Sequence, residues 1–331
     1  MKRREFIALV GGAAASLTAP LAARAQQAPR LRRLGILMPF SPTDTVWRSR
    51  VAALRQELER LKWTQGENIE FDERWTTDNM DLVRANAANL VELKPDAIVA
   101  VGGRVIPILM QLTRTVPIIC PGAVDAVGLG YAESLARPGG NVTGFSTMEF
   151  SVFGKILGTL KQIAPGTSRV AMIYNPDNPG TIQFRLQFES FAVPLSVQPI
   201  YVPIHSITEI ERAIEALAEQ PNGGVFFPPD ITITALRDQV TPLVARHRVP
   251  AIYTDRIFVT SGGLASYDAD RIDIFRRAAS YVDRILHGEK PADMPFQQPT
   301  QYQLTLNPKA AKAIGLTIPR SLLDSADEVI E

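Results

Sequence analysis

Residues 139–171 read GGNVTGFSTMEFSVFGKILGTLKQIAPGTSRVA, and this stretch decides how the chain is divided. Strand-then-helix patterns precede it and end in the turn residues Arg137–Gly140. After a second turn at residues 165–166, the apolar run Val170–Tyr174 begins another series of alternating strand and helix patterns. Two similar α/β halves are therefore expected. Val142–Met148 lies between them and is extended in character, so we interpret it as a hinge strand that leaves one half and enters the other.

Apolar runs of strand length recur between helical patterns in both halves. Alternating strands and helices predict parallel, doubly wound sheets with right-handed crossovers. The predicted fold class is thus α/β, with two doubly wound parallel-sheet lobes. A short helix is expected at Leu129–Leu135. The predicted strands are Leu34–Pro39, Ile69–Trp75, Ala97–Val101 and Val116–Cys120 in the first half, and Val170–Tyr174, Ser196–Val202, Gly224–Phe227, Pro250–Tyr253 and Gly263–Tyr267 in the second.

The N-terminus has the pattern of a secretory signal. Lys2–Arg4 is a basic start, an apolar run of small residues extends to Leu21, and Ala23-Arg24-Ala25 is a small-x-small cleavage site. Arg3-Arg4 followed by Glu-Phe-Ile resembles the twin-arginine export motif, and an ordinary signal with two basic residues is the alternative. We therefore expect residues 1–25 to be a signal peptide, cleaved after about Ala25, and the protein to be exported to the periplasm.

Composition indicates a globular protein without nucleic-acid or lipid partners. The 331 residues are 46% hydrophobic and 21% charged, which suits a sizeable core. Loss of residues 1–25 removes four basic residues and one acidic residue, so the formal net charge falls from +1 to −2. Such a chain has no basic surplus to bind phosphates or anionic membranes. Cys120 is the only cysteine, so an intramolecular disulfide and a lipid anchor at the cleavage site are both excluded.

Ligands of doubly wound sheets bind outside the carboxyl ends of the strands, so the residues there are candidate contacts. Gly102 and Gly103 let a backbone approach a ligand, and Arg104 could hold a carboxylate; an ordinary strand-to-helix turn is the alternative. Acidic and amide residues at other strand ends could meet an ammonium group, although helix capping alone also explains them. The predicted ligand-binding residues are Phe40, Ser41, Thr43, Asp44, Gly102, Gly103, Arg104, Ala123, Asp125, Asn175, Asn178, Asp230, Asp255 and Tyr267.

Nothing in the sequence indicates catalysis, a metal or a cofactor. His205, His247 and His287 are scattered and lack metal-ligand spacing. Residues 144–148 (GFSTM) fail the nucleophile-elbow pattern at the last position, and neither a Walker loop nor a dinucleotide fingerprint occurs. We interpret the chain as a binder rather than an enzyme; a periplasmic α/β hydrolase is a weaker alternative.

Six blocks of sequence, in order, resemble the ABC transporter substrate-binding protein family that includes tryptophan- and tyrosine-type binders. The resemblance covers about residues 34–331. The blocks are ARPGGNVTGFS (136–146), IYNPDNP (173–179), RHRVPAIY (246–253), GGLASY (262–267), RRAASYVDRILHGEKPADMP (276–295) and NPKAAKAIGLTIPRSLLDSADEVIE (307–331).

This resemblance implies a periplasmic-binding-protein type I fold with a three-strand hinge. Lobe 1 would comprise residues 33–145 plus about 268–298, and lobe 2 residues 146–267 plus about 299–331, with the ligand cleft between them. The implied function is solute binding for an ABC importer: a monomer closes around a small solute, an amino acid or related carboxylate, and delivers it to an inner-membrane permease. A periplasmic sensor subunit for a membrane kinase or chemoreceptor is the alternative, because the fold serves both.

Overall fold

The computed structural model describes residues 31–330, so the expected signal peptide at residues 1–25 lies outside the described residues. From Arg32 onward the chain forms one compact unit that contains two sheets, each flanked by helices. The predicted α/β fold class with two parallel-sheet lobes is confirmed. We call the five-stranded sheet with its helices lobe 1 and the seven-stranded sheet with its helices lobe 2.

Lobe 1 is a parallel sheet in the order β2-β1-β3-β4-β5. Its apolar runs form strands because both faces of the sheet are covered by helices. The strands are β1 (Arg32–Met38), β2 (Ile69–Trp75), β3 (Ala97–Ala100), β4 (Ile118–Ala123) and β5 (Val142–Ser146). The helices are α1 (Thr45–Arg60), α2 (Met80–Glu92), α3 (Ile106–Leu112) and α10 (Arg271–Leu286).

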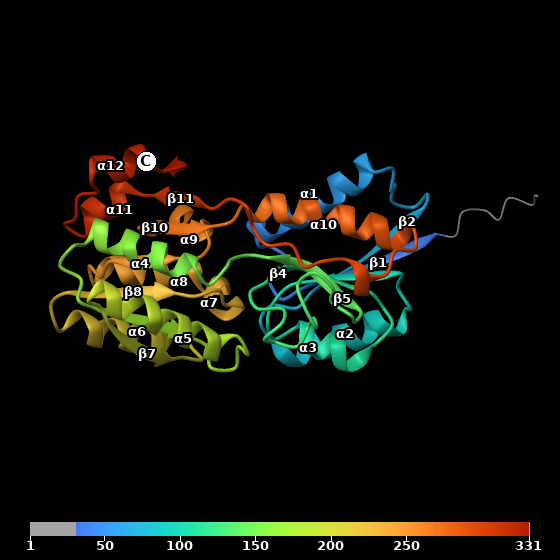
Figure 1. The fold of residues 1–331 in the computed structure, drawn as a ribbon, viewed down its shortest axis with the longest axis horizontal. Coiled ribbons are helices and arrows are strands. Elements are labelled where there is room, and N and C mark those ends of the chain that lie inside the picture. Colours follow the sequence, from blue (N-terminus) through green and yellow to red (C-terminus); the bar gives the residue numbers. More distant parts are fainter. Residues whose placement is uncertain (1–30, 331) are drawn as a thin grey trace, which may run out of the picture. The chain divides into compact units, whose positions relative to one another are not determined.

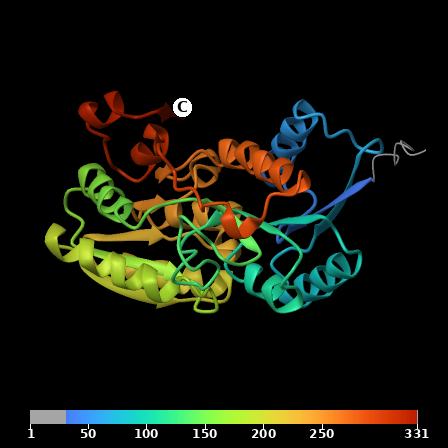
Figure 2. The ribbon, with the colours of Figure 1, turned by 45° about the vertical axis from the view of Figure 1, so that its right-hand side comes forward.

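Successive residues of β1 point to opposite faces of this sheet and enter two different cores. Leu34 and Ile36 pack with α1 and α10, whereas Leu37 packs with α2 and α3. Figures 1 and 2 both show the orange α10 beside the blue α1, although more than 200 residues separate them in sequence. The chain therefore returns to lobe 1 after it has built most of lobe 2.

Lobe 2 is a sheet in the order β12-β11-β10-β9-β8-β6-β7. Its strands are β6 (Arg169–Tyr174), β7 (Gln198–Pro203), β8 (Gly223–Phe227), β9 (Ala251–Tyr253), β10 (Ala265–Asp268), β11 (Gln303–Leu306) and β12 (Glu328–Val329). Its helices are α4 (Val152–Ile163), α5 (Thr181–Ala192), α6 (Ile207–Ala218), α7 (Ile231–Ala235), α8 (Arg237–Arg246), α9 (Ile257–Thr260), α11 (Pro308–Ala313) and α12 (Arg320–Asp324).

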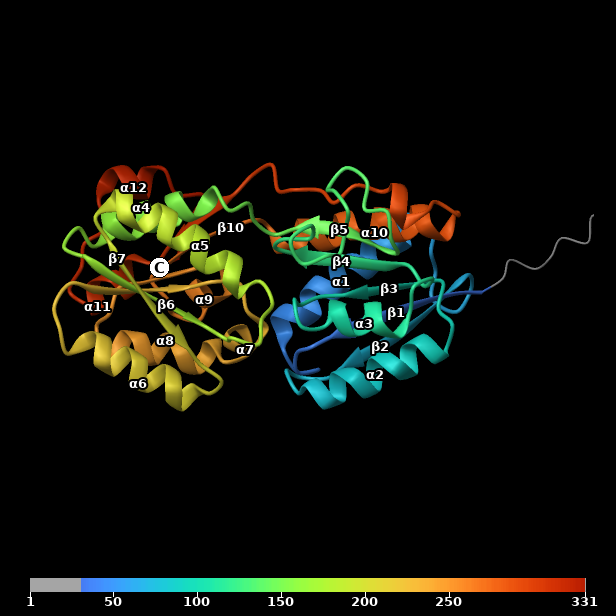
Figure 3. The same ribbon diagram turned by 60° about the horizontal axis from the view of Figure 1, so that its bottom comes forward.

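The lobe 2 sheet also separates two cores. Val170 and Met172 pack on the side of α4 and α5, and Ala171 and Ile173 on the side of α6 and α8. Figure 3 shows α6 and α8 together on one side of this sheet. Two strands depart from the predicted parallel arrangement: β11 is antiparallel to β10, and β12 is parallel to β11 and so also runs opposite to the other strands. The reason is that β11 is reached from lobe 1 by an extended segment rather than by a crossover helix.

The chain passes between the lobes three times. It leaves lobe 1 between β5 and α4, returns between β10 and α10, and leaves again between α10 and β11. The loops at the strand ends of the two lobes face each other, since residues of both lobes line one cavity.

Two local predictions were wrong. Residues 129–135 form turns instead of a helix, because Gly130 adopts a positive φ of 71° and reverses the chain. The apolar spacing of residues 80–93 predicts an inward face of Leu82, Ala85, Leu90 and Leu93. In the structure the buried residues of α2 are Val83, Ala87 and Leu90, so Leu90 is as predicted, while Leu82 is 48% exposed. Leu82 and Val83 are adjacent and both apolar, so the helical spacing of the sequence fits either residue on the inward face. Packing against the sheet buries Val83.

Candidate functional site

A cavity of about 90 Å³ lies between the strand-end loops of lobes 1 and 2. Lobe 1 contributes the segments after β1, β3 and β4 and the start of α10, and lobe 2 contributes the loops after β6, β8 and β9. This is the edge at which doubly wound sheets bind ligands. The cavity is therefore the candidate site.

The lobe 1 wall of the cavity is mostly apolar. Phe40 and Trp47 stack with 3.8 Å between ring centroids, and Phe275 meets Trp47 edge-on at 6.2 Å. Val101, Cys120 and Tyr131 continue this surface, and the Tyr131 hydroxyl donates a hydrogen bond to the carbonyl of Gly103. Burial raises the pKa of the Cys120 thiol to about 12, so this cysteine acts as an apolar lining group rather than a nucleophile.

Gly102 and Gly103 permit the two lobes to approach closely. A Cβ on Gly102 would lie 3.1 Å from Cγ2 of Ile231, and one on Gly103 would lie 3.0 Å from Oδ1 of Asn178. Ile231 and Asn178 both belong to lobe 2. The glycine pair was predicted to let the backbone approach a ligand, and in the structure its backbone instead approaches the opposite lobe's side chains Ile231 and Asn178.

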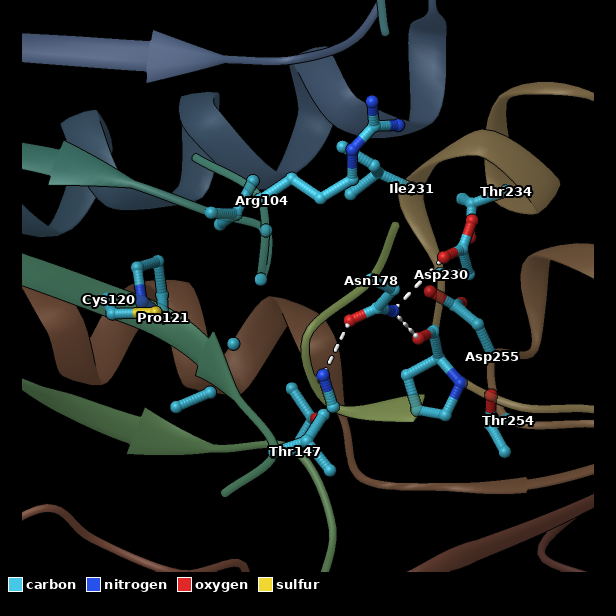
Figure 4. A pocket seen from close by; sticks show the side chains of 18 of the residues that line it. Arg104, Cys120, Pro121, Thr147, Asn178, Asp230, Ile231, Thr234, Thr254 and Asp255 are labelled. Carbon is cyan, nitrogen blue, oxygen red and sulfur yellow. Dashed lines mark hydrogen bonds between the residues drawn. The ribbon is translucent and has the colours of Figure 1, made fainter. Parts of the chain in front are cut away.

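Arg104 extends from lobe 1 towards lobe 2 beside Ile231 (Figure 4). One of its amino groups lies 3.4 Å from the hydroxyl of Thr232, and the other lies 3.7 Å from the carboxylate of Asp177. Both distances are long, and the side chain keeps 18% of its surface exposed. Arg104 lines the cavity with a guanidinium that has donors to spare.

The lobe 2 wall of the cavity is polar, and Asp230 is its central carboxylate. One oxygen of Asp230 caps α7 by accepting from the amides of Thr232 and Ile233, and the other accepts from the side chain of Asn178 at 3.0 Å. Burial raises the pKa of Asp230 to about 6, although these hydrogen bonds and the charge of Arg104 oppose the shift. Figure 4 shows Asn178 and Asp230 side by side in the cavity wall.

A buried ion pair also lines the cavity. Arg50 of α1 donates to both carboxylate oxygens of Asp255, at 2.8 and 2.9 Å, and its guanidinium lies 4.3 Å from the centre of the Trp47 ring. Arg271 donates to the carbonyl of Thr254, and its Nε lies 3.9 Å from Asp255. Burial alone would raise the pKa of Asp255, but the two guanidinium groups outweigh it and lower that pKa.

The structure brings eight of the predicted ligand-binding residues into the cavity lining. These are Phe40, Gly102, Gly103, Arg104, Ala123, Asn178, Asp230 and Asp255.

The other six predicted residues lie outside the lining and have other partners. The hydroxyls of Ser41 and Thr43 bond each other, and Asp44 caps α1 and pairs with Arg237. Asp125 accepts from the amide of Gly128, the side-chain amide of Asn175 donates to Thr232, and Tyr267 stacks on Tyr302. Short-range capping uses up most of these polar groups.

Several lining residues were not predicted, and Arg50 is the clearest case. It belongs to the buried stripe of α1 together with Trp47, Val51 and Leu54. A charged residue on the apolar face of a helix needs a partner, and this was the signal that could have found it. Thr147 lies within the predicted hinge strand Val142–Met148 and Arg271 begins α10, and the sequence gives no comparable signal at either residue.

Asp268, which is buried beside this site, should make the stability of the folded chain depend on pH. It is buried at the end of β10, and burial together with the charge of Asp255 raises its pKa to about 7. The folded chain holds this proton up to about pH 7, whereas a carboxyl in the unfolded chain releases it near pH 3.8. Stability from this group is therefore lost as the pH rises from about 4 to 7, and Asp268→Asn should flatten this part of the stability profile.

The measurement is urea unfolding of both proteins at several pH values between 4.5 and 8. The exposed Asp293 offers a control, and Asp293→Asn should leave the profile unchanged. An Asp268→Asn profile parallel to that of the original protein would contradict the assignment.

Among residues 31–330, no helix is both long and apolar enough to cross a membrane. The same residues contain no group of three or more His, Cys, Asp or Glu side chains placed to hold a metal ion.

Comparison with known proteins identifies relatives of the same architecture. A curated "Tyrosine-binding protein" of Clostridioides difficile is 24% identical over 262 residues, which cover 78% of this chain and 74% of that protein. Among solved structures, an ABC domain in complex with L-Trp from Streptococcus pneumonia superposes with a TM-score of 0.84 at 22% identity, covering 91% of this chain and all of that one.

A ligand-free, open substrate-binding protein with adhesive properties from Clostridium difficile matches with a TM-score of 0.67 at 20% identity, covering 91% of this chain and 99% of that one. The family model described as "ABC transporter substrate binding protein" matches residues 47–330, most of the chain. The resemblance noted in the sequence blocks is thereby confirmed, and the chain belongs to the ABC transporter substrate-binding protein family.

Proposed function

We propose that this protein is the periplasmic solute-binding component of an ABC importer, and that it binds an amino acid or a related carboxylate between its lobes. The observation that carries the proposal is the cavity, which combines an aromatic and apolar surface on lobe 1 with arginines from lobe 1 and carboxylates from lobe 2. The family supports the transport role. The names of the relatives, one a tyrosine-binding protein and one a complex with L-Trp, support an amino acid.

Asp230 is the proposed partner of the solute's ammonium group. It is the one lining carboxylate without an ion pair in the described chain, since Asp255 is engaged by Arg50. A cation would stabilise its ionised form, which burial disfavours. The apolar side chain of the solute would then lie against Phe40 and Tyr131 on the opposite wall.

Unpaired donors support an acceptor group on the solute. Nε1 of Trp47 and Nε of Arg271 are buried without a hydrogen-bond partner among the described residues, and both side chains line the cavity. A buried donor left unpaired costs about 1–3 kcal/mol. With the spare donors of Arg104, these groups suit a carboxylate once the walls shift to admit it.

Binding would proceed by hinge closure. Residues 33–145 with about 268–298 would move as lobe 1, and residues 146–267 with about 299–331 as lobe 2, about the three crossing segments. The solute favours closure because it contacts both walls at once. The closed monomer would then be recognised by an inner-membrane permease, after export directed by residues 1–25. We propose a binder rather than an enzyme, and none of the three histidines lines the cavity.

The test is a thermal-shift and calorimetry screen of residues 26–331 with amino acids, aromatic acids, nucleosides and sugars. Amino acids or related carboxylates should stabilise the protein, by about 2.7 kcal/mol at 100 times Kd. Ligand pockets commonly have volumes of about 300–1,000 Å³, so a solute as large as tryptophan must part the walls further than a small one. Stabilisation by sugars or nucleosides but by no carboxylate would overturn the proposal.

A further inference from the structure

Two buried ion pairs join α1 of lobe 1 to lobe 2. Asp44, the N-cap of α1, lies 2.7 Å from Nη1 of Arg237 in α8, and Arg50 binds Asp255. Each of these four side chains has 9% or less of its surface exposed. A charge in such a place is stable only while its partner is present.

The Asp44–Arg237 pair stands apart from the solute cavity. Neither residue lines the cavity, whereas Arg50 and Asp255 both do. Its two ends are nevertheless tied to the lining: the second carboxylate oxygen of Asp44 accepts from the amide of Trp47, and Arg237 also donates to the carbonyl of Thr234. The pair does not face the solute, so its main effect on binding is expected through the position of the lobes.

The position of the pair explains how it would respond to lobe motion. Asp44 and Arg237 are 193 positions apart and lie on different lobes, so parting the lobes separates the charges and returns both to water. In this arrangement each charge has lost most of its water. Arg237 is the ion-pair partner of Asp44, whereas Arg237 also has the exposed carboxylate of Asp238 at 3.7 Å. Closing the lobes without Arg237 would therefore bury Asp44 without a partner.

We propose that Asp44 and Arg237 form an inter-lobe latch that favours closure and raises solute affinity without contacting the solute. This inference rests on the proposed function of the cavity. If only the closed protein holds solute firmly, the apparent affinity for every solute scales with the closed population. Loss of the latch should therefore raise the Kd of every solute by the same factor. Loss of a residue that touches the solute would instead change the ratio of the Kd values of different solutes.

The experiment compares Arg237→Met with Arg320→Met, which removes an exposed arginine from a pair within lobe 2 (Arg320 and Asp324). The probes are L-tyrosine and L-tryptophan, measured by calorimetry. Arg237→Met should raise both Kd values by about tenfold or more and by equal factors, with Arg320→Met unchanged. Equal Kd values in the original protein and Arg237→Met, or unequal factors for the two probes, would overturn the latch.

A double variant separates the latch from simple damage to the fold. Asp44→Asn keeps an oxygen to cap α1 and removes the charge, so the double variant with Arg237→Met leaves no lone charge. It should recover part of the affinity lost by Arg237→Met. A loss equal to the product of the two single losses would contradict coupling between the residues.

Small-angle scattering gives a readout that needs no solute, and so distinguishes a failed latch from a failed assignment of the solute. Arg237→Met should have a larger radius of gyration than the original protein, with an unchanged midpoint of urea unfolding. Identical radii of the two proteins would overturn the latch even if a solute is found.

Discussion

Replacing Gly144 with alanine should lower the free energy of unfolding by about 2–6 kcal/mol, the sum of overpacking and backbone strain. Gly144 lies in β5 opposite Cys120 of β4, with φ of 154°. A Cβ there would lie 2.1 Å from the carbonyl oxygen of Cys120, which is backbone and cannot rotate away. The strands would have to part beside the cavity. Urea unfolding followed by circular dichroism measures the loss.

Gly140 supplies the matched control because it lies four residues earlier in the same segment. A Cβ on Gly140 would meet no atom within 4 Å, and its φ is not positive. Gly140→Ala should therefore change stability by less than about 1 kcal/mol. Equal losses in the two variants would show that the close approach of β4 and β5 is not what requires glycine.

Asp230→Asn should produce the largest loss of binding. The change keeps the shape of the side chain and an oxygen to cap α7, but it removes the charge proposed to hold the solute's ammonium group. Truncating one partner of a buried charge pair costs about 2–5 kcal/mol, which is a rise in Kd of roughly 30- to 4,000-fold. Calorimetry with L-tyrosine measures it.

The pH dependence of binding provides a second check on Asp230. Its pKa is about 6, so L-tyrosine should bind the original protein more tightly as the pH rises from 5 to 7 and the carboxylate ionises. Asp230→Asn should lose this dependence. Asp230→Asn should not weaken binding of the amine-free analogue 3-(4-hydroxyphenyl)propanoate. Asp81→Asn, which alters a carboxylate 97% exposed on α2, should change the binding of neither solute. Equal weakening of both solutes by Asp230→Asn would contradict an ammonium contact.

Which strand-end residues reach the cavity was only partly predictable. Asp44 and Asp230 look alike in the sequence, since both follow a strand and cap a helix, and in the structure both do so. Asp230 faces the cavity, whereas Asp44 faces Arg237. A capping side chain bonds amides two and three residues later in the chain, so the local sequence is enough to predict that Asp44 and Asp230 are caps. The direction of the remaining oxygen depends on a partner almost 200 residues away.

The sequence by itself determined the strand order along the chain, the two α/β lobes and the strand-end region where the cavity lies. Periodic apolar residues and local capping fix these features, and both act over a few residues. Only the tertiary structure decided the walls of the cavity. Trp47, Arg50 and Arg271 come from helices whose own patterns predict core or surface, and they become lining because three crossings bring distant segments together. The two arginines are buried and therefore need partners, which they have on lobe 2: Arg50 binds Asp255, and Arg271 binds the carbonyl of Thr254. No local sequence pattern indicates these pairings.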